Sequence, residues 1–347
     1  MRKIGYTSIR VALKWLLFIY FGKITVNGKS NIPINKPVLF LSNHQNAFLD
    51  TILIGTDCNR SPYFLARSDV FKNGILKVIF TFFRMIPIYR IRDGLDSLKN
   101  NQRTFATCSI LLNSNEAVVI FPEGNHNLKR RVRPLSKGFT RVLFSALKDN
   151  TELDIQLVPV GLNYNNAAGF PDKASVCYGK AIPIQTLYNV YDEQTSMLRI
   201  KKVVFESLKT LTTHIQDDEN YFETIKKLDA LGADYLKPNT INDKLLDLTT
   251  TIKMPDMING IDWLDALKKT LFNLINFPVV ILWHKLVKPK IKEPEFISTF
   301  RFAFAIGVYP FYYLVLFVAS NFIWNLTIAT LVIVGVFTFN LLYTKSN

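Results

Sequence analysis

Two long apolar stretches near the end of the chain most constrain how it can fold. Residues 302–320 and 322–342 contain no charged side chain, and each approaches the ~20 residues that an α-helix needs to cross a bilayer. Basic residues flank the pair on its outer sides, namely Lys285, Lys288, Lys290, Lys292, Arg301 and Lys345. Because positive charge marks the cytoplasmic side of a span, the sequence predicts a transmembrane hairpin with both outer ends in the cytoplasm.

Two further segments are apolar but do not meet the same criterion. Residues 271–284 form a short run that contains Pro278, which favours a buried, re-entrant or interfacial helix over a third span. Residues 6–22 carry Arg10 and Lys14 among apolar side chains. This pattern predicts a retained amphipathic helix at the membrane interface, and an ordinary amphipathic core helix is the alternative.

Between these ends, short β-rich runs alternate with helical stretches, which is typical of an α/β domain with helices covering a mostly parallel sheet. The predicted strands are 38–43, 61–67, 85–90, 117–124, 155–164 and 174–184, and the helical stretches are 104–114 and 137–149. After these runs the sequence shows a helical pattern with mixed charges, and Gly232 and Pro238 are its clearest breaks. The predicted organisation is an interfacial helix (1–23), an α/β domain (24–185), a helical extension (186–270) and a membrane region (271–347).

The charge of the chain restricts its partners. A net charge of +15 predicts anionic ones. Since no zinc-finger, RRM or helix-turn-helix pattern is visible, the sequence argues against nucleic acid and favours phosphate groups and anionic membrane lipids. The cysteines, Cys58, Cys108 and Cys177, are widely separated and odd in number. They indicate neither a disulfide framework nor a metal site, so a reducing compartment is expected.

A candidate catalytic pair follows the apolar run at 38–41. His44 lies where that run ends, and a neutral imidazole at a strand end is suited to take a hydroxyl proton near pH 7. Asp50 can accept a hydrogen bond from the other ring nitrogen. Residues six apart on a helix point about 240° apart, so His44 must lie in the turn before the helix that carries Asp50. The alternative is structural, with His44 bound to backbone and Asp50 as a helix-start carboxylate.

A second polar group follows the strand at 117–121. In Pro122-Glu123-Gly124, Gly124 permits a tight turn and Glu123 can hold a hydroxyl-bearing substrate or orient its neighbours. Lys137 opens a helical stretch whose cation and free amides could receive a phosphate. Arg90 suits bidentate phosphate contact, with a solvated surface arginine as the alternative. Other basic residues are predicted to bind membrane or an acidic carrier, namely Arg84, Arg92, Arg103, Lys129, Arg130, Arg131 and Arg133.

In order and separation these motifs resemble four sequence blocks of the glycerolipid acyltransferase family, which includes lysophosphatidic acid and glycerol-3-phosphate acyltransferases. The blocks here are Asn43-His44 with Asp50, Ile86-Pro87-Ile88-Tyr89-Arg90, Phe121-Pro122-Glu123-Gly124 and Val158-Pro159-Val160. The resemblance covers residues 24–185. It implies that His44 acts as general base on an acceptor hydroxyl that attacks an acyl thioester directly, and that Asp50 orients His44. It also implies that Arg90, Glu123 and Gly124 bind glycerol phosphate and that the 158–160 strand shapes an acyl-chain site.

Two departures from the family pattern leave the acceptor open. The five residues between His44 and Asp50 are one more than most of the family has, as in a branch with glycerol-3-phosphate and dihydroxyacetone-phosphate acyltransferases. Asn125-His126-Asn127 replaces the common Thr-Arg-Ser, so His126 either contacts phosphate or replaces His44 as base, and we favour phosphate contact. We expect glycerol 3-phosphate or its monoacylated form as acceptor, acyl-CoA or acyl carrier protein as donor, and no metal or other cofactor.

Two other functions compete with this interpretation. A membrane-anchored lipid-binding protein with the same fold would show no turnover, and the intact His44 and Asp50 argue against it. A hydrolase that uses the same His44 and Asp50 is the other possibility, but neither a Gly-x-Ser-x-Gly elbow nor a plausible cysteine nucleophile is visible. The sequence thus predicts a membrane-bound acyltransferase of phospholipid synthesis, with its catalytic domain on the cytoplasmic face and its oligomeric state open.

Overall fold

The computed structural model describes residues 2–89, 99–248 and 263–346. Within them, an eight-stranded sheet has the order β1-β7-β6-β2-β5-β3-β4, with β8 paired to β6. The strands are β1 (Lys23–Asn27), β2 (Val38–Ser42), β3 (Tyr63–Arg67), β4 (Met85–Ile88), β5 (Ala117–Ile120), β6 (Gln156–Tyr164), β7 (Lys173–Tyr178) and β8 (Ile182–Pro183). The β6–β7 and β6–β8 pairs are antiparallel and the other pairs are parallel. This arrangement confirms the predicted α/β class.

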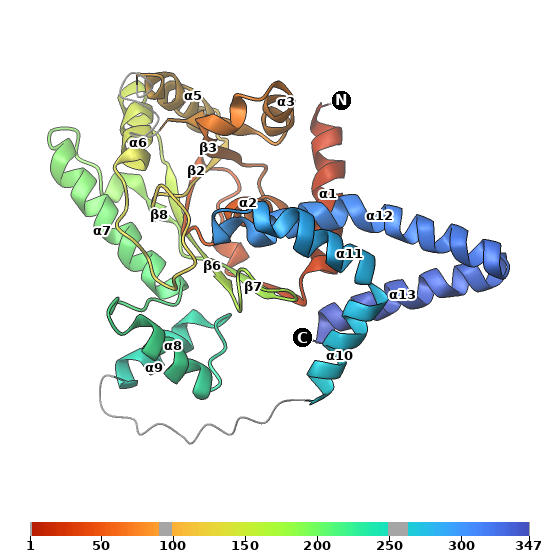
Figure 1. The fold of residues 1–347 in the computed structure, drawn as a ribbon. Coiled ribbons are helices and arrows are strands. Elements are labelled where there is room, and N and C mark those ends of the chain that lie inside the picture. Colours follow the sequence, from red (N-terminus) through yellow and green to blue (C-terminus); the bar gives the residue numbers. More distant parts are fainter. Residues whose placement is uncertain (1, 90–98, 249–262, 347) are drawn as a thin grey trace.

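Helices cover both faces of this sheet (Figure 1). Side chains alternate between the faces of a strand, so Val38 and Phe40 of β2 pack in one core cluster and Leu39 and Leu41 in the other. Helices α1 (Arg2–Tyr20) and α2 (Ala47–Asp57) contribute to the first cluster, and α5 (Asn101–Asn113), α6 (Gly138–Asp149) and α7 (Glu193–Leu211) to the second. A strand that is buried on both sides needs an unbroken apolar run, which explains the apolar sequence of β2.

Most strands and helices lie where the sequence predicts them. The run at 174–184 is the exception, because a turn divides it into β7 and β8. Sequence patterns missed the edge strand β1 and the helix α3 (Gly74–Phe82). The run Lys23–Asn27 does alternate polar and apolar residues, which is the period-two pattern of a strand, so the sequence carried a signal for β1.

The two apolar stretches form helices α12 (Ile297–Ile323) and α13 (Leu326–Ser346), which project from the α/β core as a hairpin (Figure 1). In the described part of the chain, these two helices are long and apolar enough to cross a membrane by length and composition. Helix α12 begins earlier than the predicted span at 302–320. The predicted membrane hairpin is therefore present as two candidate spans.

A bent helical pair precedes the hairpin. Helix α10 (Trp263–Ile275) is followed by α11 (Phe277–Leu282), and the helical segments on either side of Asn276 differ in direction by 88°. Asn276 is fully buried and exchanges side-chain hydrogen bonds of 2.7 and 3.0 Å with Asn340 of α13. The bend fits a re-entrant or broken segment, as Pro278 and the short length of 271–284 indicate.

Arg10 and Lys14 of α1 contact other parts of the protein. The Arg10 guanidinium donates to the carbonyl oxygens of Thr56, Cys58 and Arg60 at the end of α2, and Lys14 Nζ lies 2.8 Å from Asp57 Oδ1. Cations are favourable there because the last carbonyls of a helix carry partial negative charge. The apolar face with Val11, Trp15, Phe18 and Ile19 is left exposed. A place for α1 at the membrane interface stays a prediction.

The helices after residue 186 form two groups. Helix α7 packs on the sheet through Ile200, Val204 and Leu208, so it shares the α/β core although it follows the predicted boundary at 185. Helices α8 (Tyr221–Ala230) and α9 (Pro238–Leu248) have a small core of their own. The predicted breaks agree with this, because Gly232 has φ of 62° and α9 begins at Pro238.

The close approach of the C-terminal end of α7 to β6 yields a stability prediction. A Cβ at Gly161 would overlap the backbone carbonyl of Leu211. We expect Gly161→Ala to lower the free energy of unfolding by about 2 kcal/mol, because backbone must move to admit the methyl group. Urea unfolding in detergent measures this. At Gly307 a Cβ would have nothing within 4 Å, so Gly307→Ala is the control, and an equal loss in both variants would contradict the argument.

Candidate active site

The site lies where two neighbouring strands end. Strands β2 and β5 are parallel, and Leu41 is paired with Ile120, so the loops after them leave the same edge of the sheet. The first loop carries His44, and the second carries Glu123 to His126. The ring of His44 stacks on Phe121 with centroids 3.9 Å apart, and Asn127 N donates to His44 O at 3.0 Å. Sheet topology thus brings together the two groups that the sequence singled out.

His44 and Asp50 are in direct contact. His44 Nδ1 lies 2.7 Å from Asp50 Oδ2, with 15% of the His44 side chain and none of the Asp50 side chain exposed. His44 lies in the turn before α2 and Asp50 in the first turn of that helix, as the spacing argument required. A carboxylate without a proton only accepts hydrogen bonds, so the tautomer that fits this contact has its hydrogen on Nδ1 and leaves the Nε2 lone pair to accept a proton.

Other groups hold the Asp50 carboxylate in place. Oδ2 also accepts from the backbone N–H groups of Gln45 and Asn46 at 2.9 and 2.8 Å, and Oδ1 accepts from the Tyr164 hydroxyl at 2.5 Å. Tyr164 ends β6, which continues past β2 at this edge. The Asn43 side chain pairs with both backbone groups of Leu162 and ties the loop to that strand. The imidazole is therefore oriented by a buried, fully bonded partner.

Glu123 is paired with Arg133, one of the basic residues predicted to bind membrane or an acidic carrier. The Glu123 side chain is 2% exposed, and its Oε2 accepts from Arg133 Nη2 at 2.5 Å and Nε at 3.1 Å. Its Oε1 accepts from Arg133 N at 3.1 Å. Burial raises the pKa of Glu123, and Arg133 opposes that shift. Of the two roles that the sequence left open, this geometry favours orienting the neighbouring loop.

Arg133 also organises the turn itself. Its guanidinium donates to the side-chain and backbone oxygens of Asn125, so Asn125 is engaged although it lies at the surface. Gly124 has φ of 81°, a conformation that glycine adopts without strain. No periodic signal connects Arg133 to Glu123, because the loop between them has no regular structure. The presence of basic residues in the same loop as Glu123 is the signal that could have indicated this pairing.

His126 lies beside His44, with ring centroids 5.4 Å apart. Its Nδ1 is 3.7 Å from Glu293 Oε2, and the ring meets Phe296 edge-on. His126 therefore joins the loop after β5 to the segment that leads into α12. Burial and the nearby His44 lower the pKa of His126 to about 4, so the ring is neutral near pH 7. One ring nitrogen of His126 and one carboxylate oxygen from each of Glu293 and Glu295 lie within 4.8 Å of one another, close enough to hold a metal ion. Exposed acidic groups commonly cluster in this way without binding a metal.

The depressed pKa of His126 predicts an acid-dependent loss of stability. The unfolded chain takes up a proton at His126 near pH 6.5, whereas the folded protein does so only near pH 4. Stability should therefore fall as the pH drops from about 6.5 to about 4. The His126→Gln variant should show a shallower fall. Thermal unfolding in detergent at a series of pH values measures both slopes, and equal slopes would refute the assignment.

The remaining predicted site residues have different surroundings. Lys137 is exposed and precedes α6, and Ser136 N donates to Pro122 O at 2.7 Å, so that helix begins beside the Pro-Glu-Gly turn. Arg90 lies outside the described residues. Val158 and Val160 are buried in the sheet core. They do not line the large cavity described below.

In this site a fixed imidazole can remove a proton. The imidazole lies beside a turn that follows a parallel strand. The protein that carries the site has an α/β fold and two candidate membrane spans. Comparison of the sequence with known protein families gives a consistent result. Residues 23–163 match the model of the Acyltransferase family. The resemblance to glycerolipid acyltransferases that the four motifs predict is thereby confirmed.

Known proteins with similarity to this chain carry related names. It is 24% identical to glycerol-3-phosphate O-acyltransferase 1 of Saccharomyces cerevisiae over 33% of this chain and 16% of that protein. It is 27% identical to a chloroplastic 1-acyl-sn-glycerol-3-phosphate acyltransferase of Brassica napus over 34% of this chain and 33% of that protein. An uncharacterised acyltransferase of Schizosaccharomyces pombe is 25% identical over 38% of this chain and 20% of that protein. The chain thus spans a third or less of each relative.

Among solved structures, the chain is similar to the 1-acyl-sn-glycerophosphate acyltransferase of Thermotoga maritima. The sequence identity is 18% and the TM-score is 0.42. The match covers 60% of this chain and 78% of that one.

Proposed function

We propose that this chain transfers a fatty acyl group from a thioester to a hydroxyl of glycerol 3-phosphate or of its monoacylated form, in phospholipid synthesis. The observation that carries the proposal is the 2.7 Å contact between His44 and a fully buried, fully bonded Asp50. This arrangement suits a general base, because it presents Nε2 to a hydroxyl and stabilises the imidazolium that forms. The match of residues 23–163 to the Acyltransferase family supports acyl transfer as the reaction.

The proposed reaction has one chemical step without an acyl-enzyme. His44 Nε2 takes the proton of the acceptor hydroxyl while the hydroxyl oxygen attacks the thioester carbonyl carbon. A carbon–oxygen bond forms, the carbon–sulfur bond breaks, and the sulfur leaves as a thiolate. The imidazolium then returns its proton to that thiolate, so the products are an ester and a thiol. Neither a metal nor another cofactor takes part in this mechanism.

The phosphate of the acceptor is proposed to bind along the loop after β5. Gly124, Asn125 and His126 lie in the turn beside His44. Lys137 precedes the first turn of α6 and follows Ser136, whose N–H donates to Pro122 O. A cation and free amides at a helix start suit a phosphate. Glu123 would act through Arg133 by holding the turn. Arg90 is proposed as a further phosphate ligand because it belongs to the Ile86-Pro87-Ile88-Tyr89-Arg90 motif that resembles the family.

The protein is proposed to act at the cytoplasmic face of a membrane. Two candidate spans support membrane attachment. Lys285, Lys288, Lys290 and Lys292 precede the hairpin and Lys345 ends it, which supports cytoplasmic outer ends. The acyl donor, either acyl-CoA or acyl carrier protein, would then reach the site from the cytoplasm. Anionic lipids would be attracted by the net charge of +15.

Thioester consumption by the full chain in detergent tests the proposal. Each donor, acyl-CoA or acyl carrier protein, is offered with glycerol 3-phosphate, dihydroxyacetone phosphate or lysophosphatidate, and free thiol is measured. We expect thiol release that depends on glycerol 3-phosphate or lysophosphatidate. Release without any acceptor would indicate a hydrolase. No release with any pair would favour a lipid-binding protein without turnover.

A further inference from the structure

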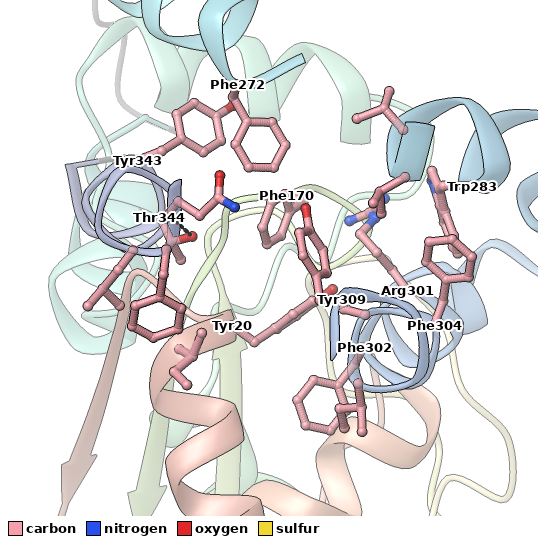
Figure 2. A pocket seen from close by; sticks show the side chains of 18 of the residues that line it. Tyr20, Phe170, Phe272, Trp283, Arg301, Phe302, Phe304, Tyr309, Tyr343 and Thr344 are labelled. Atoms are coloured by element: carbon pink, nitrogen blue, oxygen red, sulfur yellow. Dashed lines mark hydrogen bonds between the residues drawn. The ribbon is translucent and has the colours of Figure 1, made fainter. Parts of the chain in front are cut away.

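A cavity of about 510 Å³ lies between α1, α10, α11, α12 and α13 (Figure 2). Its wall is mainly apolar and aromatic, with Tyr20, Phe170, Phe272, Trp283, Phe302 and Tyr309 among its side chains. Among the described residues, those that line it include none from the loops that carry His44 and Glu123. Its size lies within the roughly 300–1,000 Å³ of sites that take one small ligand. The cavity is therefore separate from the proposed acyl-transfer site.

An arginine lines this apolar cavity. Arg301 of α12 donates from Nη1 to Gly169 O at 2.5 Å and from Nη2 to Ala168 O at 3.1 Å. Its guanidinium lies 5.3 Å from the ring centre of Trp283 and 5.9 Å from that of Phe170. No carboxylate of the described residues forms an ion pair with it. A guanidinium has five N–H donors, so its charge and several donors remain for an anion.

A second cation belongs to the same wall. Lys269 of α10 lines the cavity, although most of its side chain is exposed. Positive charge at an apolar cavity suits a ligand with an acyl chain and an anionic head. An anion without a chain would leave the aromatic wall uncovered, and burying each methylene contributes to binding.

The membrane helices indicate where such a ligand would come from. The apolar windows of α12 and α13 are only 6% and 11% buried inside the protein, and both helices line the cavity. The wall opposite α12 is held in place, because Phe272 stacks on Tyr343 with centroids 4.3 Å apart and Asn276 pairs with Asn340. The cavity thus lies beside the lipid that would surround the hairpin.

We infer that this cavity binds one membrane lipid with an anionic phosphate headgroup, with an acyl chain against the aromatic wall and the headgroup at Arg301. This inference does not depend on acyl transfer. The same turn of α12 also contacts the loop that carries His44, because Thr299 Oγ1 donates to Asn46 O at 3.3 Å. Ser298 Oγ donates to Ala167 O, in the loop between β6 and β7, at 2.7 Å. The Asn46 side chain donates to the same Ala167 oxygen. A bound lipid would therefore hold the segment that supports the His44 turn.

Tryptophan quenching by brominated lipid tests the inference. In the full chain with Trp15, Trp263 and Trp324 replaced by Phe, Trp283 is the remaining tryptophan, and it lines the cavity. The protein is placed in phosphatidylcholine vesicles that contain either brominated phosphatidate or brominated phosphatidylcholine. We expect phosphatidate to quench Trp283 at about a tenfold lower mole fraction. Equal quenching by the two lipids would overturn the anionic headgroup.

Variants separate the headgroup from the cavity. Arg301→Gln should abolish the preference for phosphatidate, whereas Arg301→Lys should retain most of it because the charge remains. Ala305→Phe fills the cavity and should reduce quenching severalfold, and Ala303→Phe is the matched control on the same helix because residue 303 is exposed and does not line the cavity. An unchanged preference in Arg301→Gln, or equal quenching in the two alanine variants, would refute the site. Only variants that keep the thermal unfolding midpoint are compared.

Discussion

Replacing His44 with alanine should lower the rate of acceptor-dependent thiol release by about 10³-fold, within the roughly 10²–10⁴-fold that a general base contributes. The variant loses the imidazole that is proposed to take the hydroxyl proton, while the loops that are proposed to bind substrate remain. The measurement is kcat for thiol release in detergent at saturating donor and acceptor. KM for the acceptor should change much less than kcat, because the imidazole acts mainly in the transition state.

Two further variants distinguish the candidate bases. Asp50→Asn should also cost orders of magnitude, because an amide can donate to Nδ1 and would favour the tautomer with the proton on Nε2. His126→Gln should leave kcat within about tenfold of wild type, since a residue that only helps to bind phosphate affects KM first. If His126→Gln removed turnover and His44→Ala did not, His126 would be the base. Equal turnover in wild type and His44→Ala would reject the mechanism.

Replacing Arg133 with glutamine should lower the free energy of unfolding by about 3–5 kcal/mol, because it leaves the Glu123 carboxylate buried without its partner. Glu123 is 2% exposed and Arg133 is 16% exposed, so water screens this pair little. Urea unfolding in detergent measures the loss. The loss should shrink as the pH falls toward the raised pKa of Glu123, because protonation removes the unpaired charge.

The chain offers a matched control for this prediction. Arg131 pairs with Asp218 at 3.1 Å, but half of the Asp218 side chain is exposed. Arg131→Gln should therefore cost less than about 1 kcal/mol, as exposed ion pairs do. In the double variant Glu123→Gln with Arg133→Gln, most of the lost stability should return, because no buried charge remains. Equal losses for Arg131→Gln and Arg133→Gln would show that the Glu123 pair has no special role.

Local patterns in the sequence account for much of the architecture. The apolar runs of β2 and β5, the two candidate spans and the start of α9 at Pro238 all follow from periodicity, apolar length or backbone chemistry within a short window. The turn before α2 follows in the same way, because helix geometry forbids contact between His44 and Asp50 on one continuous helix. These features depend on neighbours in sequence, so the sequence alone was sufficient to predict them.

Other features depend on how distant segments meet. The hydrogen bond from Tyr164 to Asp50 exists because β6 lies beside β2 and continues past it. The pairing of Arg133 with Glu123 depends on the path of an irregular loop. Arg10 and Lys14 bind the end of α2, a partner that the amphipathic pattern of α1 could not reveal.

The sequence by itself thus determined the class of fold, the candidate spans and the pair of residues at the centre of the site. Only the tertiary structure decided what holds Asp50, what neutralises Glu123 and that Arg301 lines an apolar cavity between membrane helices. The reason is physical. Periodicity and capping act within a few residues. Burial and charge pairing instead depend on the order of the strands and the path of the loops, and no local sequence pattern specifies these.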